Sequence, residues 1–209
     1  MPAVEHLLAL ELLNPQTVID VGANKGQFSL AVRYLYPSAK IHAFEPLRAE
    51  RAVYKSVVSG PAQIHPVALG AKKGSADFFI TVNADSSSLL PPARNQTEAY
   101  GTLLSTKTSV SVERLSDALS SEELIGPVLL KMDVQGAELQ VLEGAEEVLP
   151  LIDALYSEVS FVQLYMGQPT ASAIISFLER RGFILRGCFN TSFTSRFGPT
   201  QSDILFLRR

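Results

Sequence analysis

Cysteine is nearly absent from this sequence: Cys188 is the only one in 209 residues. A single cysteine excludes a disulfide within the chain and a zinc site built from several cysteines, and it fits the cytoplasm. The sequence also has no long apolar run and no basic leader with a cleavage site, which argues against a membrane span and a signal peptide. We therefore expect a soluble, cytoplasmic protein.

The chain also lacks an excess of basic charge. Lysine and arginine number 18 against 21 aspartates and glutamates, which gives a net charge of -3. Without a large positive field, sequence-independent binding to nucleic acid or to an anionic membrane is not expected. Hydrophobic residues make up 46% of the chain, enough to bury the core of one α/β domain over residues 1–209. Because nucleic acid and membrane are not expected as partners, we expect the partner to be a small molecule.

A strand followed by a glycine turn organises the chain. Residues 17–21 read as a buried strand, Gly22 and Gly26 mark the turn after it, and a helix is expected at 28–36. Glycine lets a ligand approach the backbone, and the free N–H groups in the first turn of the helix favour an anion. Asp20 supplies a negative charge nearby. This combination suits a zwitterionic group, such as an amino acid with both termini free.

Strands and helices alternate after this turn. Strands are expected at 40–44 and 63–69, with a helix at 47–58 between them. Such an alternation implies parallel pairing, right-handed crossovers and ligands at the carboxyl ends of the strands. In the second half of the chain, strands are expected at 128–133, 154–159, 183–188 and 202–207, and helices at 137–149 and 171–181. The predicted fold is α/β, with seven strands in the main sheet.

The N-terminal segment stands apart from this alternation. Residues 1–14 read as a helix that ends at Asn14 and Pro15. We expect this helix to cover one edge or face of the sheet, with the binding of a partner as the alternative.

A long polar segment interrupts the middle of the chain. After a predicted strand at 74–82, residues 83–105 carry two prolines and no clear periodicity. A segment of that length without regular structure is typical of a lid or a substrate loop, with a solvated loop as the alternative. We interpret residues 85–89 as part of a cover over the site. A short extended piece at 107–112 and a short helix at 113–121 are expected to follow.

Three acids, Asp20, Glu45 and Asp133, end three predicted parallel strands and should converge at one edge of the sheet. In nucleotide-binding folds, an acid about 20 residues beyond the glycine turn accepts hydrogen bonds from ribose hydroxyls, and Glu45 fits that place. The dinucleotide fingerprint is missing, because Asn24 stands where the second glycine is needed. Asp20 would also repel a pyrophosphate. S-adenosyl-L-methionine therefore fits better than a nicotinamide dinucleotide.

The order of these motifs resembles that of the FkbM-like methyltransferases. The matching segments are VIDVGANKG at 18–26, AFEP at 43–46, VALG at 67–70, SSL at 87–89, LKMDVQGAE at 130–138, LEGA at 142–145 and QSD at 201–203. The resemblance implies a class I, Rossmann-like methyltransferase fold with an antiparallel last strand. It also implies S-adenosylmethionine as methyl donor and O-methylation of a hydroxyl on a sugar or another small secondary metabolite.

The resemblance also implies the residues of the cofactor site. These are Asp20, Gly22, Ala23, Asn24, Gly26, Ser29, Glu45, Pro46, Ala68 and Asp133.

Two departures from the family pattern bear on the substrate. Gln135 replaces the second acid of the usual Asp-Val-Glu-Gly-Ala-Glu motif, so one carboxylate is lost. The strand that ends at 157–160 carries no histidine, although the family often has one near that position.

Methyl transfer from a sulfonium is an in-line displacement, in which the enzyme aligns the acceptor oxygen and removes its proton. Asp133 is the first candidate for the base, with hydrogen bonding to the cofactor or to loop amides as its alternative role. Glu138, one helical turn further on, is the second candidate, although an acid at a helix N-terminus more often compensates the helix dipole. Glu158 is a third acid on the same edge. We assign no metal to these acids.

Several other residues are weaker candidates. Phe28 and Phe44 either contact adenine or methionine or pack in the core. The loop 190–198 either contacts the substrate or simply connects the last two strands. Neither His42 nor His65 is favoured as a base. Two other functions stay open: a binding module that keeps the cofactor but has lost the chemistry, and a nicotinamide-dependent oxidoreductase, against which the missing Tyr-x-x-x-Lys pair counts.

Overall fold

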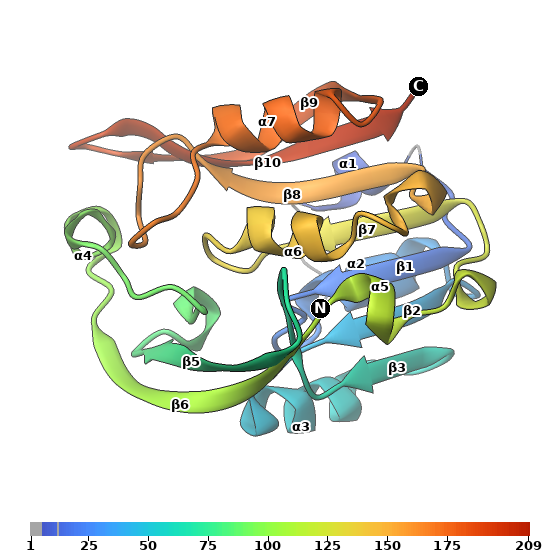
Figure 1. Cartoon of the computed structure of the whole chain (residues 1–209), viewed down its shortest axis with the longest axis horizontal. Coiled ribbons are helices and arrows are strands. Elements are labelled where there is room, and N and C mark those ends of the chain that lie inside the picture. Colours follow the sequence, from blue (N-terminus) through green and yellow to red (C-terminus); the bar gives the residue numbers. More distant parts are fainter. Residues whose placement is uncertain (1–5, 12) are drawn as a thin grey trace.

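A seven-stranded sheet forms the centre of the computed structural model, which describes residues 6–11 and 13–209 (Figure 1). Its strands are β1 (Thr17–Val21), β2 (Lys40–Phe44), β3 (Ala62–His65), β7 (Val128–Met132), β8 (Ala154–Ser160), β9 (Phe183–Thr194) and β10 (Gly198–Arg208). They lie in the order β3-β2-β1-β7-β8-β10-β9. The first five pair in parallel, and β10 is antiparallel to both neighbours. The predicted α/β, Rossmann-like fold with an antiparallel last strand is confirmed.

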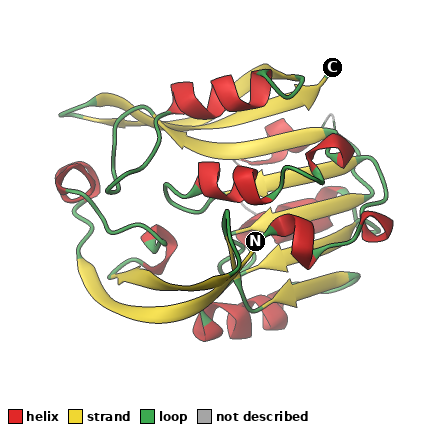
Figure 2. Cartoon of the chain, viewed as in Figure 1, coloured by secondary structure: helices red, strands yellow, loops and turns green. Residues whose placement is uncertain are grey.

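Helices cover both faces of this sheet (Figure 2). In Figure 1, α5 (Leu115–Ala118), α6 (Glu138–Gly144) and α7 (Ala171–Glu179) lie in front, with α1 (Leu7–Leu10) and α2 (Gln27–Leu35) behind. Helix α3 (Arg48–Val57) belongs to the rear layer, because its Tyr54 packs in the same core cluster as residues of α1 and α2. The short 3₁₀ helices η3 (Ser121–Glu123) and η4 (Leu149–Leu151) complete these layers.

The central strands are mostly apolar, apart from the pair Asp20 and Lys131, because both of their faces are covered. All five residues of β1 and all five of β7 are buried. Successive side chains of a strand point to opposite faces. Ile19 accordingly packs with the α5–α7 layer, whereas Val18 packs with the α1–α3 layer. This double burial fixes the register of β1 and therefore the position at which the glycine turn leaves the sheet.

A second, smaller sheet lies beside the first. It contains β4 (Ala68–Leu69), β5 (Gly74–Thr81) and β6 (Leu104–Glu113) in the order β4-β6-β5. The expected single strand at 63–69 is therefore wrong: residues 62–65 stay in the large sheet, whereas residues 68–69 pair with β6. Pro66 lies between them, and proline interrupts a ladder because it has no N–H to donate.

The segment 83–105 is not without regular structure. It contains η2 (Ala84–Ser86) and α4 (Arg94–Tyr100), and it ends in the long strand β6 rather than in the short piece expected at 107–112. Within the expected N-terminal helix, the structure has α1, while residues 1–5 and 12 lie outside the described part. None of the helices in residues 6–11 and 13–209 is long and apolar enough to cross a membrane.

Candidate active site

The turn after β1 is shaped by close contact with the end of β7. Gly22 has φ +72°, and a Cβ atom there would lie 1.9 Å from the carbonyl oxygen of Asp133. Only glycine fits such a position. The N–H groups of Gly22 and Ala23 donate to the carbonyl oxygen of Phe44, at 3.1 and 3.0 Å. The ends of β1, β2 and β7 therefore meet at this turn.

A narrow cleft, here called the glycine-turn cleft, opens at this meeting point. Six of the expected cofactor residues line it: Gly22, Asn24, Glu45, Pro46, Ala68 and Asp133. Apolar side chains that the sequence did not single out, Leu47 and Phe78 among them, line it as well. Its inner volume is about 60 Å³, room for a few water molecules. Asp85, Ser87 and Leu89 also contribute, so the expected cover does border the cleft.

Glu45 is fixed in this cleft by backbone donors. Leu47 N donates to its Oε1 at 2.7 Å, and Asn24 N donates to its Oε2 at 3.1 Å. Burial raises the pKa of the Glu45 carboxyl to about 7, although these two hydrogen bonds oppose the shift. Beside it, Asn24 Oδ1 is buried and has no partner within the described residues. The cleft thus presents two acceptor groups to a ligand.

Asp20 lies beneath the turn and does not line the cleft. Its side chain is fully buried, and Oδ1 lies 3.0 Å from Lys131 Nζ. Ser29 Oγ donates to Asp20 Oδ2 at 2.7 Å, and Lys131 Nζ donates to Gly22 O at 3.0 Å. Burial acts to lower the pKa of Lys131, but the carboxylates of Asp20, Asp133 and Asp203 together outweigh burial, and the pKa is raised. Lys131 therefore stays charged, and its contacts with Asp20 and Gly22 O support the turn from below.

The other expected cofactor residues also lie behind the turn. Ala23 is buried and does not line the cleft, and Gly26 packs against Val58 and Tyr54. Phe28 belongs to the rear core, so its core alternative holds. Phe44, in contrast, lines the cleft. It stacks on His65, with ring centroids 4.5 Å apart.

A bridge of hydrogen bonds joins the acids at the ends of β7 and β8. Gln135 Nε2 donates to Asp133 Oδ1 at 2.7 Å and to Glu158 Oε2 at 2.8 Å. Gln201 Nε2 donates to the same Glu158 oxygen at 2.9 Å. An acid at position 135 would put a third carboxylate here, so the amide of Gln135 relieves a repulsion and ties two acids together.

Glu158 lies between two other acids of this group. It is in register with Asp203 on β10, and Gln135 links it to Asp133. Burial, reinforced by the charges of Asp133 and Asp203, raises the pKa of Glu158 well above its usual range. Like charges this close repel one another, so the neighbouring acids favour the protonated form of Glu158.

Glu138 supports the loop rather than facing a cavity. Its Oε1 accepts hydrogen bonds from Gly136 N at 3.0 Å and from Val134 N at 3.3 Å. The side chain is buried, which raises its pKa to about 7. It lines neither the glycine-turn cleft nor the cavity beside it. This position fits its alternative role as the acid that compensates the loop and helix amides.

A polar cavity of about 390 Å³ adjoins the glycine-turn cleft. Asp85, Asp133 and Gln135 line both spaces. The remaining lining residues are Asn83, Ser86, Gln96, Tyr100, Thr102, Glu158 and Gln201. Sequence reasoning missed Gln96, Tyr100 and Thr102, because they follow no motif. Their only signal was that they belong to the long polar segment.

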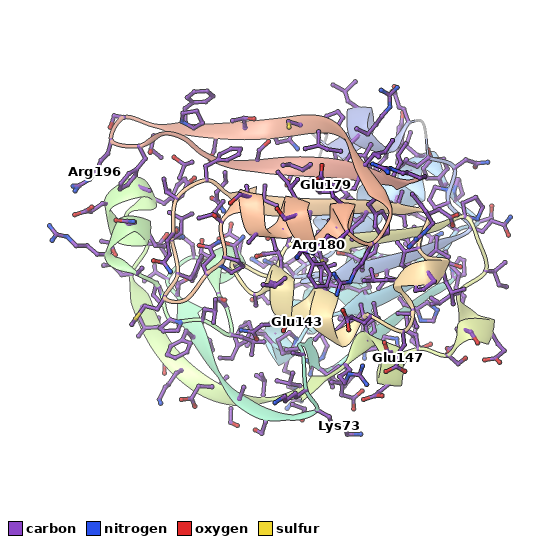
Figure 3. The ribbon with its side chains drawn as sticks, turned by 45° about the horizontal axis from the view of Figure 1, so that its top comes forward. Lys73, Glu143, Glu147, Glu179, Arg180 and Arg196 are labelled. Atoms are coloured by element: carbon purple, nitrogen blue, oxygen red, sulfur yellow. The ribbon has the colours of Figure 1, made fainter. Side chains whose placement is uncertain are left out.

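The hairpin of β9 and β10 closes one side of this cavity. Figure 3 shows Arg196 at the far end of the hairpin, next to α4, and its Nη1 lies 3.1 Å from Glu98 Oε2. Tyr100 and Ser192 also share a hydrogen bond of 2.7 Å between their hydroxyls. The loop expected at 190–198 is therefore wrong in extent: residues 190–194 belong to β9 and β10 begins at Gly198, and this end of the hairpin contacts α4.

Comparison with known proteins agrees with this geometry. Residues 20–185 match the family described as "Methyltransferase FkbM domain". The 2-O-methyltransferase NoeI of Sinorhizobium fredii is 31% identical over 172 residues, which cover 77% of this chain and 70% of that protein. The 31-O-demethyl-FK506 methyltransferase FkbM of Streptomyces tacrolimicus is 28% identical over 203 residues, which cover 83% of this chain and 75% of that protein.

Solved structures show the same fold at low sequence identity. Magnesium protoporphyrin IX methyltransferase from Synechocystis, solved with S-adenosylmethionine bound, has a TM-score of 0.52 at 13% identity, covering 97% of this chain and 74% of that one. The plantazolicin methyltransferase BpumL, in complex with S-adenosylhomocysteine, has a TM-score of 0.52 at 11% identity. The match covers 99% of this chain and 81% of that one. This chain is a member of the FkbM family of methyltransferases, whose methyl donor is S-adenosylmethionine.

Proposed function

We propose that the protein transfers a methyl group from S-adenosylmethionine to a hydroxyl oxygen of a sugar or another small secondary metabolite. The observation that carries this proposal is the position of Asp133, which lines both the glycine-turn cleft and the polar cavity. A carboxylate at that boundary can reach a group in either space. The names of two relatives, a 2-O-methyltransferase and a 31-O-demethyl-FK506 methyltransferase, support a hydroxyl as the acceptor.

The residues of the cleft fit the cofactor. The Glu45 carboxylate, oriented by two backbone donors, suits the ribose hydroxyls, and the unpaired Asn24 Oδ1 offers a further acceptor. Leu47 and Phe78 offer apolar surface for a base. When bound, S-adenosylmethionine supplies an electrophilic methyl group on a sulfonium. Among the expected residues, Gly22, Asn24, Glu45, Pro46 and Ala68 are proposed to contact it.

The expected residues behind the turn are proposed to act indirectly. Asp20 holds Lys131, and Lys131 holds the carbonyl group of Gly22. Ser29 completes the hydrogen bonding of Asp20, and Gly26 lets the following helix pack against Tyr54. These contacts set the position of the backbone that faces the cofactor.

Asp133 is proposed to accept the proton of the acceptor hydroxyl. Gln135 donates a hydrogen bond to its carboxylate and also binds Glu158, whose pKa is raised by burial and by the charge of Asp133. The polar cavity then holds the acceptor, so its hydroxyl and the methyl group meet at the boundary between the two spaces. Residues 83–105 are proposed as the cover, because Asp85, Ser87 and Leu89 of this segment border the cleft and Asp85 also borders the cavity.

Titration calorimetry tests the cofactor first. S-adenosylmethionine and S-adenosylhomocysteine are titrated into the wild type, Glu45→Ala and Glu147→Ala, with NADH in parallel. We expect both adenosyl compounds to bind, Glu45→Ala to weaken binding by about tenfold or more, and the exposed Glu147→Ala to leave it unchanged. Absence of adenosyl binding by folded protein would refute the proposal, and preference for NADH would favour an oxidoreductase.

An acceptor screen on hydroxylated sugars and metabolites tests the chemistry. Release of S-adenosylhomocysteine that depends on the acceptor is the expected result. Tight cofactor binding without turnover on any acceptor of this class would favour the alternative of a non-catalytic binding module.

A further inference from the structure

Two buried side chains in the polar cavity have hydrogen-bonding groups that the protein itself does not use. Gln96 on α4 is 2% exposed, and Thr102, just after α4, is 1% exposed. Gln96 Nε2 donates to Tyr165 Oη at 3.2 Å, but Gln96 Oε1 has no partner in the described part of the chain, and neither has Thr102 Oγ1. Buried polar atoms are nearly always paired in native proteins. A ligand in the cavity is therefore the expected partner of both.

The free groups of the cavity mostly accept hydrogen bonds. Gln96 Oε1 can only accept, and the carboxyl groups of Asp85, Asp133 and Glu158 line the same space. Within residues 6–11 and 13–209, no lysine or arginine lines it. A ligand that donates hydrogen bonds is complementary to such a surface, whereas a carboxylate or a phosphate would be repelled.

The amide donors next to the acids are already engaged. Gln135 Nε2 donates to two carboxyl groups, and its Oε1 accepts a hydrogen bond from Tyr165 Oη at 2.9 Å. Gln201 Nε2 donates to Glu158. Gln135 therefore has no N–H group left for an acidic ligand, whereas Gln201 has used one of its two.

We propose that Gln96 and Thr102 form a subsite for hydrogen-bond donors. It binds a second hydroxyl or an amino group of the methyl acceptor, close to the hydroxyl that is methylated. This inference rests on the proposed methyltransferase function and narrows its substrate class. The acceptor is a neutral or cationic polyol, such as a sugar or an amino sugar, and carries no acid group at this point. The segment 83–105 thus contributes to specificity as well as to the cover.

Three monosaccharides of similar size test the subsite. Glucose, glucosamine and glucuronate are titrated into the wild type, Thr102→Val, Gln96→Met and Thr106→Val, with and without S-adenosylhomocysteine, and binding is followed by protein-observed NMR. Thr102→Val removes the hydroxyl with little change of shape, and Thr106→Val makes the same change at an exposed position on β6. The melting temperature of each variant checks its fold.

We expect glucose and glucosamine to bind, and glucuronate to bind about tenfold more weakly or not at all. Thr102→Val and Gln96→Met should each weaken glucose binding by about threefold to tenfold, as the loss of one hydrogen bond predicts, and Thr106→Val should not. Equal binding of glucuronate, absence of binding by both other sugars, or unchanged affinity in Thr102→Val would each overturn the inference.

The cofactor titration separates this inference from the proposed function. Normal S-adenosylhomocysteine binding combined with the wrong sugar pattern would refute the subsite alone. The expected sugar pattern combined with no adenosyl binding would refute the methyltransferase function alone.

Discussion

Glycine at position 22 is required by the carbonyl group that faces it. Gly22→Ala would place a Cβ atom 1.9 Å from Asp133 O at φ +72°, so β1 and β7 would have to separate. We expect the free energy of unfolding to fall by about 2 kcal/mol or more. Gly74→Ala is the matched control, because a Cβ atom there meets nothing within 4 Å. Denaturant unfolding measures both, and equal losses would contradict the argument.

Asp133 and Glu138 can be distinguished by amide substitutions. Asp133→Asn removes the proposed proton acceptor at almost constant shape, so we expect turnover to fall about 100-fold or more while cofactor binding stays nearly unchanged. Glu138→Gln keeps an oxygen for the amides of Val134 and Gly136, so turnover should fall far less. Steady-state kinetics with the acceptor found in the screen decides this. Loss of turnover only in Glu138→Gln would reverse the assignment.

The sequence identified motif positions but not every contact. Gly22, Asn24 and Glu45 line the cleft as expected, because strand ends and turns place them there. Asp20 was expected to face the ligand, yet it is paired with Lys131 on the neighbouring strand. Cross-strand register decides such a pairing, and the sequence contains no local signal for it.

At the scale of elements, α4 was missed because tertiary contacts stabilise it. The helix has no apolar face, and its buried residue is Gln96. It is held by hydrogen bonds such as Ala93 N to Leu164 O at 2.8 Å, and it ends at Gly101 with φ +65°. Gly101 was a local signal for a helix end, but without periodicity before it the helix itself could not be predicted.

The link between α4 and the β9–β10 hairpin can be tested separately from the stability of the helix. Arg94 and Arg196 both pair with Glu98, but Arg94 belongs to α4 itself. We expect Arg196→Ala to raise amide hydrogen exchange in α4 severalfold, with a global stability change below about 1 kcal/mol because the pair is partly exposed. Arg94→Ala should have a smaller effect on exchange. Equal exchange in both variants would show that the hairpin does not hold α4.

At the scale of the whole molecule, buried carboxyl groups link stability to pH. Burial raises the pKa of Glu45 to about 7, against the usual value of 4.5. Between these two values the folded protein binds more protons than the unfolded chain, so this group's contribution to stability is lost as pH rises. His42 has the opposite sign, because burial lowers its pKa to about 4 from 6.5, and its effect favours folding as pH rises.

A comparison of variants isolates the contribution of Glu45. In the ligand-free protein, wild type should lose stability relative to Glu45→Gln between about pH 5 and pH 7, and the difference should level off above about pH 7. Denaturant unfolding at several pH values measures this difference, with the exposed Glu147→Gln as control. Parallel pH profiles for wild type and Glu45→Gln would show that the Glu45 pKa is not raised.

The main sheet could be predicted as a whole, whereas the smaller sheet could not. Buried apolar strands alternate with helices in the sequence, and that alternation determines parallel pairing. The β4-β6-β5 sheet depends on a two-residue strand, 68–69, that pairs across about forty residues with β6. A strand so short has no pattern of its own, so the arrangement of cleft and cavity was not visible in the sequence.

The loop that carries Gln135 borders both spaces, and Ser88 of the proposed cover donates a hydrogen bond to the backbone oxygen of Gln135 at 2.7 Å. Movement of the proposed cover to admit the cofactor would therefore loosen the wall of the proposed acceptor site at the same time. Kinetically, this favours a compulsory order in which the cofactor binds first and S-adenosylhomocysteine leaves last. In steady-state experiments, S-adenosylhomocysteine would then inhibit competitively against S-adenosylmethionine and noncompetitively against the acceptor.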